Sequence, residues 1–357
     1  MAKKTTFREE NDQNNILRLR DVLSTLPPYV RDFFRSIEPT TTTRTRISYA
    51  YDLRVFFEYL KKNNPIFASY DLRDFTLEEL SSLTASDIEE YMEYLKLYEG
   101  PEDRVGAQDR ITNSLSGIKR KISALRTFYA YLYKRQMIDA NPTVLVDMPK
   151  IREKTIIRLE SDEVAMLLDH IEHCGASLSG QALKYYEKTR ERDLAIVTLL
   201  LGTGIRVSEC VGLDVEDVDF RNNCLRVVRK GGNEALVYFG SEVEAALRRY
   251  LDIRKGVTPA PGDEHALFYS TQRRRMGVRS VENLVEKYAS AVTTTKKITP
   301  HKLRSTYGTA LYRETGDIYL VADVLGHKDV NTTRRHYAAM DDEKRRRAAD
   351  AVKLREE

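Results

Sequence analysis

Residues 192–209 read RDLAIVTLLLGTGIRVSE, and this stretch decides the fold of the second half of the chain. Its first ten residues are mostly apolar, which predicts a buried helix. Gly202 and Gly204 then break that helix, because glycine lets the backbone bend sharply. Arg206 follows at the expected start of another helix, where an anion is already favoured. The sequence therefore predicts a guanidinium that is displayed at a helix start.

Downstream of this stretch the hydrophobic pattern changes from helical to strand-like. Residues 224–228 and 236–239 are rich in valine, leucine and aromatic side chains. They flank residues 229–233, which read RKGGN and are typical of a hairpin turn. We therefore expect a small antiparallel sheet with Lys230 at the tip of its hairpin.

A further group of polar residues lies near the C-terminus. His301 and Arg304 are three residues apart in a helix that is expected to begin at Pro300, since proline is favoured in the first helical turn. That spacing puts both side chains on one helix face. His327 follows Leu325-Gly326, a glycine-marked approach to a helix, and Tyr337 comes ten residues later.

Together these side chains are the groups needed to cut a phosphodiester without a metal. Arginines neutralise the charge of the transition state, histidines and lysine hold or move protons, and a tyrosine can act as the nucleophile. For any one of them a structural role is an open alternative, namely a surface arginine, a solvated lysine, a helix-capping histidine or a packed tyrosine. Tyr307, Tyr312 and Tyr319 are rival tyrosines by proximity.

The order of these residues resembles that of a known family. Six residues stand in the order, and roughly the spacing, of the catalytic groups of the tyrosine recombinase/integrase family: Arg206, Lys230, His301, Arg304, His327 and Tyr337. The stretch from 188 to 209 is similar to the Xer subgroup, and within it to the single-recombinase, XerS-like type. The resemblance covers residues 158–340 closely and the N-terminal part more loosely.

The resemblance implies a role for each of these residues. Tyr337 attacks a DNA phosphate and forms a 3'-phosphotyrosyl link, while Arg206 and Arg304 clamp that phosphate. Lys230 protonates the leaving 5'-oxygen. His301 accepts or shares the tyrosine proton.

Two supporting roles complete the set. His327 donates a hydrogen bond to a non-bridging oxygen, and Glu209 orients Arg206 or a histidine. Two departures from the family pattern are visible: Ser305 follows Arg304 where many relatives carry histidine or phenylalanine, and the interval from His327 to Tyr337 is one residue longer than in many relatives.

The N-terminal part is expected to be helical. Apolar residues recur at helical spacing over 44–60, 84–95 and 111–135. The chain divides into five expected parts: residues 1–27, an arm or a first short helix; 28–142, a helical core-binding domain that the resemblance makes a DNA clamp; 143–157, a linker; 158–340, the catalytic domain; and 341–357, a tail for exchange between protomers.

Basic side chains are numerous although the net charge is only +4. The chain holds 58 Lys and Arg, and many of them occur in short clusters. Interspersed cations on one face suit a phosphate backbone, whereas solvated helix faces are the alternative. The candidate DNA-binding residues are Arg44, Arg46, Lys119, Arg120, Lys121 and Arg274.

The remaining features argue against cofactors and membranes. The chain has three cysteines, which is typical of a reducing compartment rather than a disulfide framework. His170, His173 and Cys174 lack a second ligand pair, so no metal is expected, and no phosphate-binding loop indicates ATP. No signal peptide is evident, and the apolar run 194–201 is too short to span a membrane.

The expected fold is mainly α: a helical N-terminal core-binding domain, followed by a mostly helical catalytic domain with a small antiparallel β-sheet. The resemblance implies a cytoplasmic site-specific DNA recombinase that resolves chromosome dimers at a dif-like site, as a homotetramer on two double-stranded DNA sites, without a cofactor. The alternatives are a mobile-element integrase, a type IB topoisomerase and a non-catalytic DNA-binding protein. An accessory protein is left undefined by the sequence.

Overall fold

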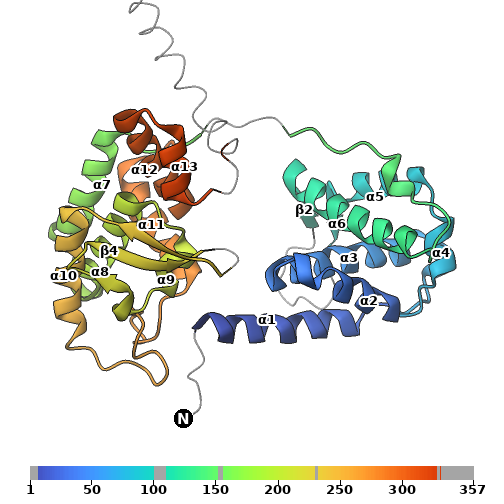
Figure 1. Cartoon of the computed structure of the whole chain (residues 1–357), viewed down its shortest axis with the longest axis horizontal. Coiled ribbons are helices and arrows are strands. Elements are labelled where there is room, and N and C mark those ends of the chain that lie inside the picture. The colour runs from blue at the N-terminus through green and yellow to red at the C-terminus, as the bar shows by residue number, and fades with distance from the viewer. Residues whose placement is uncertain (1–6, 100–109, 152–155, 230–231, 328–329, 331–357) are drawn as a thin grey trace, which may run out of the picture. The chain divides into compact units, whose positions relative to one another are not determined.

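The computed structural model describes residues 7–99, 110–151, 156–229, 232–327 and 330 (Figure 1). The chain divides into two units, Met1–Glu153 and Lys154–Glu357. Each unit has its own hydrophobic core. The two units are therefore described separately.

The first unit is a helical bundle with one small hairpin. Its elements are α1 (Phe7–Ser24), α2 (Pro28–Ser36), α3 (Thr43–Asn63), α4 (Leu77–Ser82), α5 (Ala85–Tyr94), β1 (Leu97–Glu99), β2 (Arg110–Thr112) and α6 (Leu115–Lys134), with short 3-10 turns at Glu38–Thr40, Pro65–Phe67 and Pro142–Val144. The centre of its core is aromatic: Phe33, Phe56, Tyr91 and Phe128 are at most 1% exposed. Edge-to-face ring contacts join Phe33 to Phe128 and Phe56 to Tyr91.

Two elements of this unit differ from the sequence-based expectation. Residues 7–24 form one long helix, α1, and its last turns bury Leu19 and Val22 against the bundle. The expected helix over 111–135 begins only at Leu115, because Ser114 caps it by accepting a hydrogen bond from the N–H of Gly117 at 3.3 Å. The residues before the cap pair as strand β2 with β1.

The second unit is built around one central helix, α8. Its elements are α7 (Ser161–His173), α8 (Gly180–Thr203), α9 (Val207–Gly212), β3 (Val218–Asp219), β4 (Cys224–Val228), β5 (Glu234–Tyr238), α10 (Ser241–Arg254), α11 (Val278–Val292), α12 (Pro300–Thr315) and α13 (Ile318–Leu325), with 3-10 turns at Cys174–Ser177 and Val215–Asp217. Residues 194–200 of α8 are buried, as the apolar run predicts. Helices α7, α10 and α12 all pack on α8.

The small sheet of this unit is antiparallel, in the order β3-β4-β5. Leu225 of β4 pairs with Val237 of β5, and both side chains enter the core. The predicted hairpin is thus present, and the predicted mainly α fold class is confirmed. Within the described residues, no helix is both long and apolar enough to cross a membrane.

Candidate active site

The junction between α8 and α9 positions Arg206. Gly204 ends α8 with φ +62°, and its N–H donates to the carbonyl of Leu200 at 3.1 Å. A Cβ atom at this position would lie 2.4 Å from Cδ1 of Tyr307 and 2.9 Å from Cδ2 of Leu325. Glycine is therefore required both for the turn and for the close approach of α12 and α13.

Arg206 is the N-cap residue of α9 and is held by a carboxylate. Its backbone N–H and its Nη1 donate to the two carboxylate oxygens of Glu209, each at 2.8 Å. The Glu209 side chain is only 5% exposed, whereas 34% of the Arg206 side chain is exposed. Nη2 of Arg206 donates to the carbonyl of Gly326 at 3.2 Å. Glu209 and Gly326 thus fix the guanidinium while part of it stays accessible.

Arg304 reaches the same place from α12. It is 6% exposed, its Nη1 donates to the carbonyl of Gly204 at 2.5 Å, and its Nη2 donates to the carbonyl of Leu325. Its acceptor Leu325 and the acceptor of Arg206, Gly326, are consecutive residues. The two guanidiniums therefore converge on one short segment. His301, one turn earlier on α12, is exposed.

The end of α13 forms that segment. Gly326 has φ +62°, and its N–H donates to the carbonyl of Asp323 at 2.8 Å. The N–H of His327 donates to the carbonyl of Ala322 at 2.9 Å, which completes a glycine-based helix end. Gly326 therefore ends α13, and half-buried His327 follows it directly. The expectation that a new helix follows His327 falls largely outside the described residues and stays a prediction.

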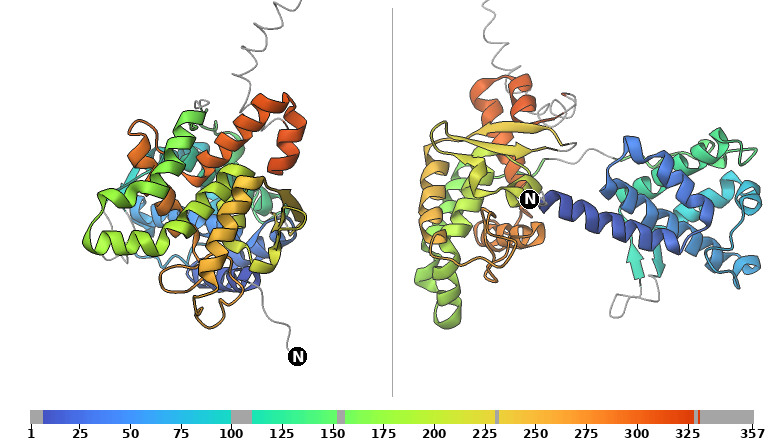
Figure 2. Two further views of the ribbon diagram at one scale, coloured as in Figure 1. Left: turned by 90° about the vertical axis from the view of Figure 1, so that its left-hand side faces the viewer. Right: turned by 60° about the horizontal axis from the view of Figure 1, so that its bottom comes forward.

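The β4–β5 hairpin reaches the same helix end through Arg229. Nη1 of Arg229 donates to the carbonyl of Asp323 at 3.1 Å, and Nη2 donates to that of Val324 at 2.9 Å. Figure 2 shows the hairpin alongside α13 in its right-hand view. Sequence reasoning treated Arg229 only as a competitor of Lys230 and missed these contacts.

Part of the predicted site lies outside the described residues. Lys230, Tyr337 and the expected tail 341–357 all belong there. The structure thus places four of the six predicted catalytic residues in one region of the second unit, on α12 and around the starts or ends of α9 and α13.

The rival tyrosines have different surroundings. Tyr307 packs against Gly204, and burial raises the pKa of its phenol, which opposes formation of a nucleophilic phenolate. Tyr312 is 6% exposed within the small core formed by α12 and α13. Tyr319 is 72% exposed and lies on the first turn of α13, at the opposite end of that helix from Leu325.

The predicted DNA-binding cations fall into two groups. Arg44, Arg120 and Arg274 are exposed and Lys119 is half-buried. The other two, Arg46 and Lys121, are at most 9% exposed.

The two buried cations have carboxylate partners. Arg46 donates to Glu38 at 2.8 Å, and Lys121 lies 3.6 Å from Asp52, which also accepts from Arg120. Arg46 and Lys121 are therefore engaged by carboxylates within the bundle.

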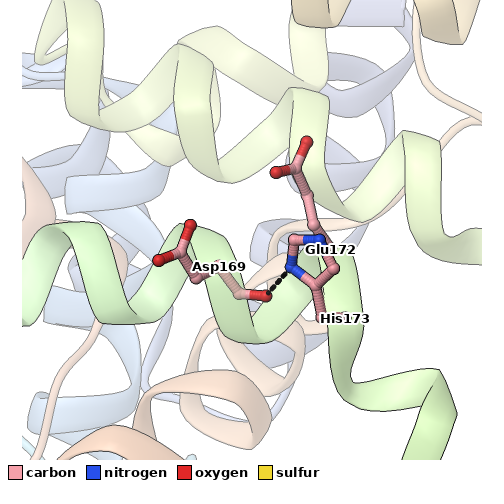
Figure 3. A group of neighbouring side chains, drawn as sticks. All are labelled: Asp169, Glu172 and His173. Carbon is pink, nitrogen blue, oxygen red and sulfur yellow. Dashed lines mark hydrogen bonds between the residues drawn. The ribbon is translucent and has the colours of Figure 1, made fainter.

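Among the described residues, one group has metal-ligand spacing, namely Asp169, Glu172 and His173 on α7 (Figure 3). Nδ1 of His173 lies 2.9 Å from the carbonyl oxygen of Asp169, in its own helix. Glu172 accepts a hydrogen bond from Arg249 at 3.0 Å. Two of the three residues are therefore already engaged within the protein, which does not favour a metal site.

Comparisons with known proteins identify the family. Residues 143–344 match the model of the phage integrase family. The chain is 31% identical to tyrosine recombinase XerC of Caldanaerobacter subterraneus subsp. tengcongensis (93% of this chain, 88% of the relative) and 31% identical to tyrosine recombinase XerS of Lactococcus lactis subsp. cremoris (97% and 100%). The crystal structure of XerH site-specific recombinase bound to a palindromic difH substrate, a post-cleavage complex, has a TM-score of 0.62 at 19% identity (99% and 91%).

Proposed function

Because the chain belongs to the phage integrase family, as a Xer-type tyrosine recombinase, we propose that the cluster at the end of α13 is where it cuts and rejoins DNA. The observation that carries this proposal is the convergence of Arg206 and Arg304 on the consecutive carbonyls of Gly326 and Leu325. Two guanidiniums from helices about 100 residues apart meet there, as a clamp on one phosphate requires.

The two arginines bind and polarise the phosphate. A guanidinium presents paired N–H donors that match two phosphate oxygens, and it stays protonated at any physiological pH. Arg206 is partly exposed and is oriented by Glu209, so it meets the phosphate from the open side. Arg304 is buried and supplies charge where water is largely excluded, which strengthens its effect on the transition state.

The remaining groups handle protons and the nucleophile. Tyr337 attacks the phosphorus and forms a new O–P bond, while His301 takes or shares the phenolic proton. The bond from phosphorus to the 5'-oxygen breaks, and Lys230 donates a proton to that oxygen. His327 donates a hydrogen bond to a non-bridging oxygen.

The covalent link makes the reaction reversible without a fuel. The 3'-phosphotyrosyl ester conserves the energy of the broken phosphodiester, so the 5'-hydroxyl of a partner duplex can attack it and release Tyr337. Two such rounds through a four-way junction exchange both strands. No cofactor enters any of these steps.

The biological substrate is proposed from the relatives. Two of them are XerC and XerS recombinases, and the XerH structure holds a difH substrate. From that likeness we infer that the substrate is a pair of double-stranded dif-like sites, held by a homotetramer in the cytoplasm. Recombination between these sites would resolve chromosome dimers. Sequencing DNA bound by the protein in cells tests this: one chromosomal site is expected, whereas binding at the ends of a mobile element would point to an integrase.

A suicide substrate tests the chemistry itself. This duplex carries a nick near the cleavage position, so that the cut fragment diffuses away and the protein stays attached to the 3'-phosphate. The wild-type protein is expected to form an adduct that survives denaturation, and Tyr337→Phe none. An adduct of equal yield with Tyr337→Phe overturns the assignment of the nucleophile. Relaxation of supercoiled DNA without pairing of two sites would indicate a type IB topoisomerase.

A further inference from the structure

Four consecutive carbonyl groups at the C-terminal end of α13, those of residues 323–326, accept hydrogen bonds from arginines outside this helix. Asp323 and Val324 accept from Arg229, and the next two carbonyls, those of Leu325 and Gly326, accept from Arg304 and Arg206. The C-terminal end of a helix carries partial negative charge, so cations are favoured there. Arg206 and Arg304 belong to the proposed phosphate clamp, and Arg229 is the third arginine at this helix end.

Arg229 joins two parts of the site through its backbone and its side chain. Its N–H donates to the carbonyl of Asn233 at 2.8 Å, and its own carbonyl accepts from the N–H of Gly232 at 3.0 Å, so its backbone closes the hairpin turn. Its side chain meanwhile bonds the end of α13. Arg229 therefore ties the start of the hairpin turn to the end of α13, and Lys230 is the next residue in the chain.

Close packing makes this contact specific. A Cβ atom on Gly326 would lie 2.1 Å from Nη1 and 2.5 Å from Cζ of Arg229. The lack of a Cβ at Gly326 therefore allows the guanidinium to lie this close to the turn. The same glycine has a positive φ and precedes His327, so the arginine packs against the segment that presents that histidine.

We propose that Arg229 is a positioning residue for strand cleavage. It fixes the hairpin at residue 229 to the α13 end that also holds Arg206 and Arg304, and so limits where Lys230, the next residue in the chain, can deliver its proton. This inference rests on the proposed function of the same site. The two Nη atoms of Arg229 fix residue 229, the chain neighbour of Lys230, to the end of α13. Arg229 acts through Lys230, because the proton must be delivered to the 5'-oxygen of the phosphate that the clamp holds.

The first experiment is single-turnover cleavage of the nicked suicide substrate over a range of protein concentrations. Arg229→Ala is expected to lower the maximal rate by about tenfold to a hundredfold, a part of what a general acid contributes. The protein concentration that gives half-maximal rate is expected to change little. The maximal rate of Arg229→Lys, which can make only one of the two contacts, is expected to lie between that of the wild type and that of Arg229→Ala.

A matched control lies three residues earlier, on β4. Arg226 of β4 is exposed and bonds Asp217 at 3.1 Å, so Arg226→Ala removes the same charge without touching α13. It is expected to cleave at the wild-type rate. Thermal unfolding of each variant by circular dichroism verifies that it is folded before rates are compared.

A substrate with sulfur in place of the bridging 5'-oxygen separates positioning from mere stability. A thiolate leaves without protonation near neutral pH, since thiols have a pKa of about 8.5, so Lys230 becomes dispensable. On this substrate Arg229→Ala and Lys230→Ala are both expected to approach the wild-type rate. Arg206→Ala is expected to stay slow, because its role does not involve the leaving group.

The outcomes are distinct. Rescue of Arg229→Ala by the sulfur substrate, together with rescue of Lys230→Ala, supports the proposal. A wild-type rate for Arg229→Ala on the ordinary substrate, or a loss that sulfur does not restore, overturns it. Failure of the wild-type protein to form any adduct would refute the proposed function instead.

Discussion

Two clusters of cations in this protein are held in different ways. In the first unit, Arg120 and Lys121 of α6 share the carboxylate of Asp52, which is buried in α3. In the second unit, the three arginines around the end of α13 donate to backbone carbonyls, and Arg206 also bonds the carboxylate of Glu209. A shared carboxylate organises the first cluster, and backbone carbonyls orient the second.

The difference teaches what each cluster is suited to do. Burial raises the pKa of Asp52 and lowers the pKa of Lys121, so both groups need each other to stay ionised inside the bundle. A carbonyl oxygen orients a guanidinium without cancelling its charge. The end of α13 can thus fix its arginines in advance and leave their positive charge for a phosphate, which is the kind of preorganisation that favours a charged transition state.

Mutations in the two clusters are expected to differ most in their effect on the rate of DNA cleavage. Arg304→Ala should lower single-turnover cleavage by about a hundredfold to a thousandfold, as for the loss of one transition-state donor. Arg120→Ala should leave the maximal cleavage rate within about threefold, because it removes a cation from a helical bundle and no donor from the site. Arg304→Lys serves as the folding control. Equal losses from the two alanine variants would abolish the distinction.

The next effect is on stability and belongs to the first unit. Asp52→Ala leaves Lys121 buried without its carboxylate and is expected to cost about 3 kcal/mol of unfolding free energy. Urea denaturation followed by circular dichroism measures it. Asp52→Asn retains a hydrogen-bond acceptor and should cost less. A loss below about 1 kcal/mol would mean that the pair contributes little to the bundle.

A smaller effect is expected at the glycine beside Arg229. Gly326→Ala adds a Cβ atom against the guanidinium and strains a residue with φ +62°, so it should cost about 1–3 kcal/mol and slow cleavage as Arg229→Ala does. Gly277→Ala is the control, because Gly277 has φ −87° and open space around its Cβ position. Equal stability and cleavage for both variants would contradict the close packing.

The smallest effect concerns a peripheral ion pair of the second unit. Lys296 bonds Glu163 at 2.5 Å and holds the pKa of that carboxyl below its ordinary value of 4.5, aided by the backbone N–H of Glu160. A lowered folded-state pKa stabilises the fold above about pH 4.5, and this contribution is lost as the pH falls through the lowered value.

Glu163→Gln measures that contribution. The unfolding free energy of the variant should lie below that of the wild type by about 1 kcal/mol or less at pH 7, and the gap should close towards pH 3. A gap that is the same at both pH values would show that the carboxylate charge is not its source.

The sequence could predict the elements with strong local signals. The apolar run 194–201 gave the buried helix α8, the turn at 229–233 gave the hairpin, and Pro300 gave the start of α12. The order of the polar residues pointed to the family. Each of these signals is contained in a short window, where periodicity or turn chemistry is decisive.

What the sequence could not supply depends on distant contacts. The bonds from Arg229 to Asp323 and Val324 span 94 and 95 residues, and no local pattern marks an arginine for such a contact. The sequence alone does not distinguish Arg46 and Lys121 from surface cations, because their partners Glu38 and Asp52 are brought beside them only by the fold. Gly326 signals a helix boundary, but the bonds that end α13 there, such as the one from the N–H of His327 to the carbonyl of Ala322, are not marked by any local pattern.

The charge of the arginine cluster can be tested most directly with an altered phosphate. A methylphosphonate at the scissile position replaces one charged non-bridging oxygen by a neutral methyl group, so less positive charge is needed to stabilise the transition state. The loss caused by Arg304→Ala is therefore expected to shrink at least about tenfold on this substrate, because the arginine acts by charge stabilisation. A loss of the same size on both substrates would contradict the idea that the end of α13 holds its arginines for their charge.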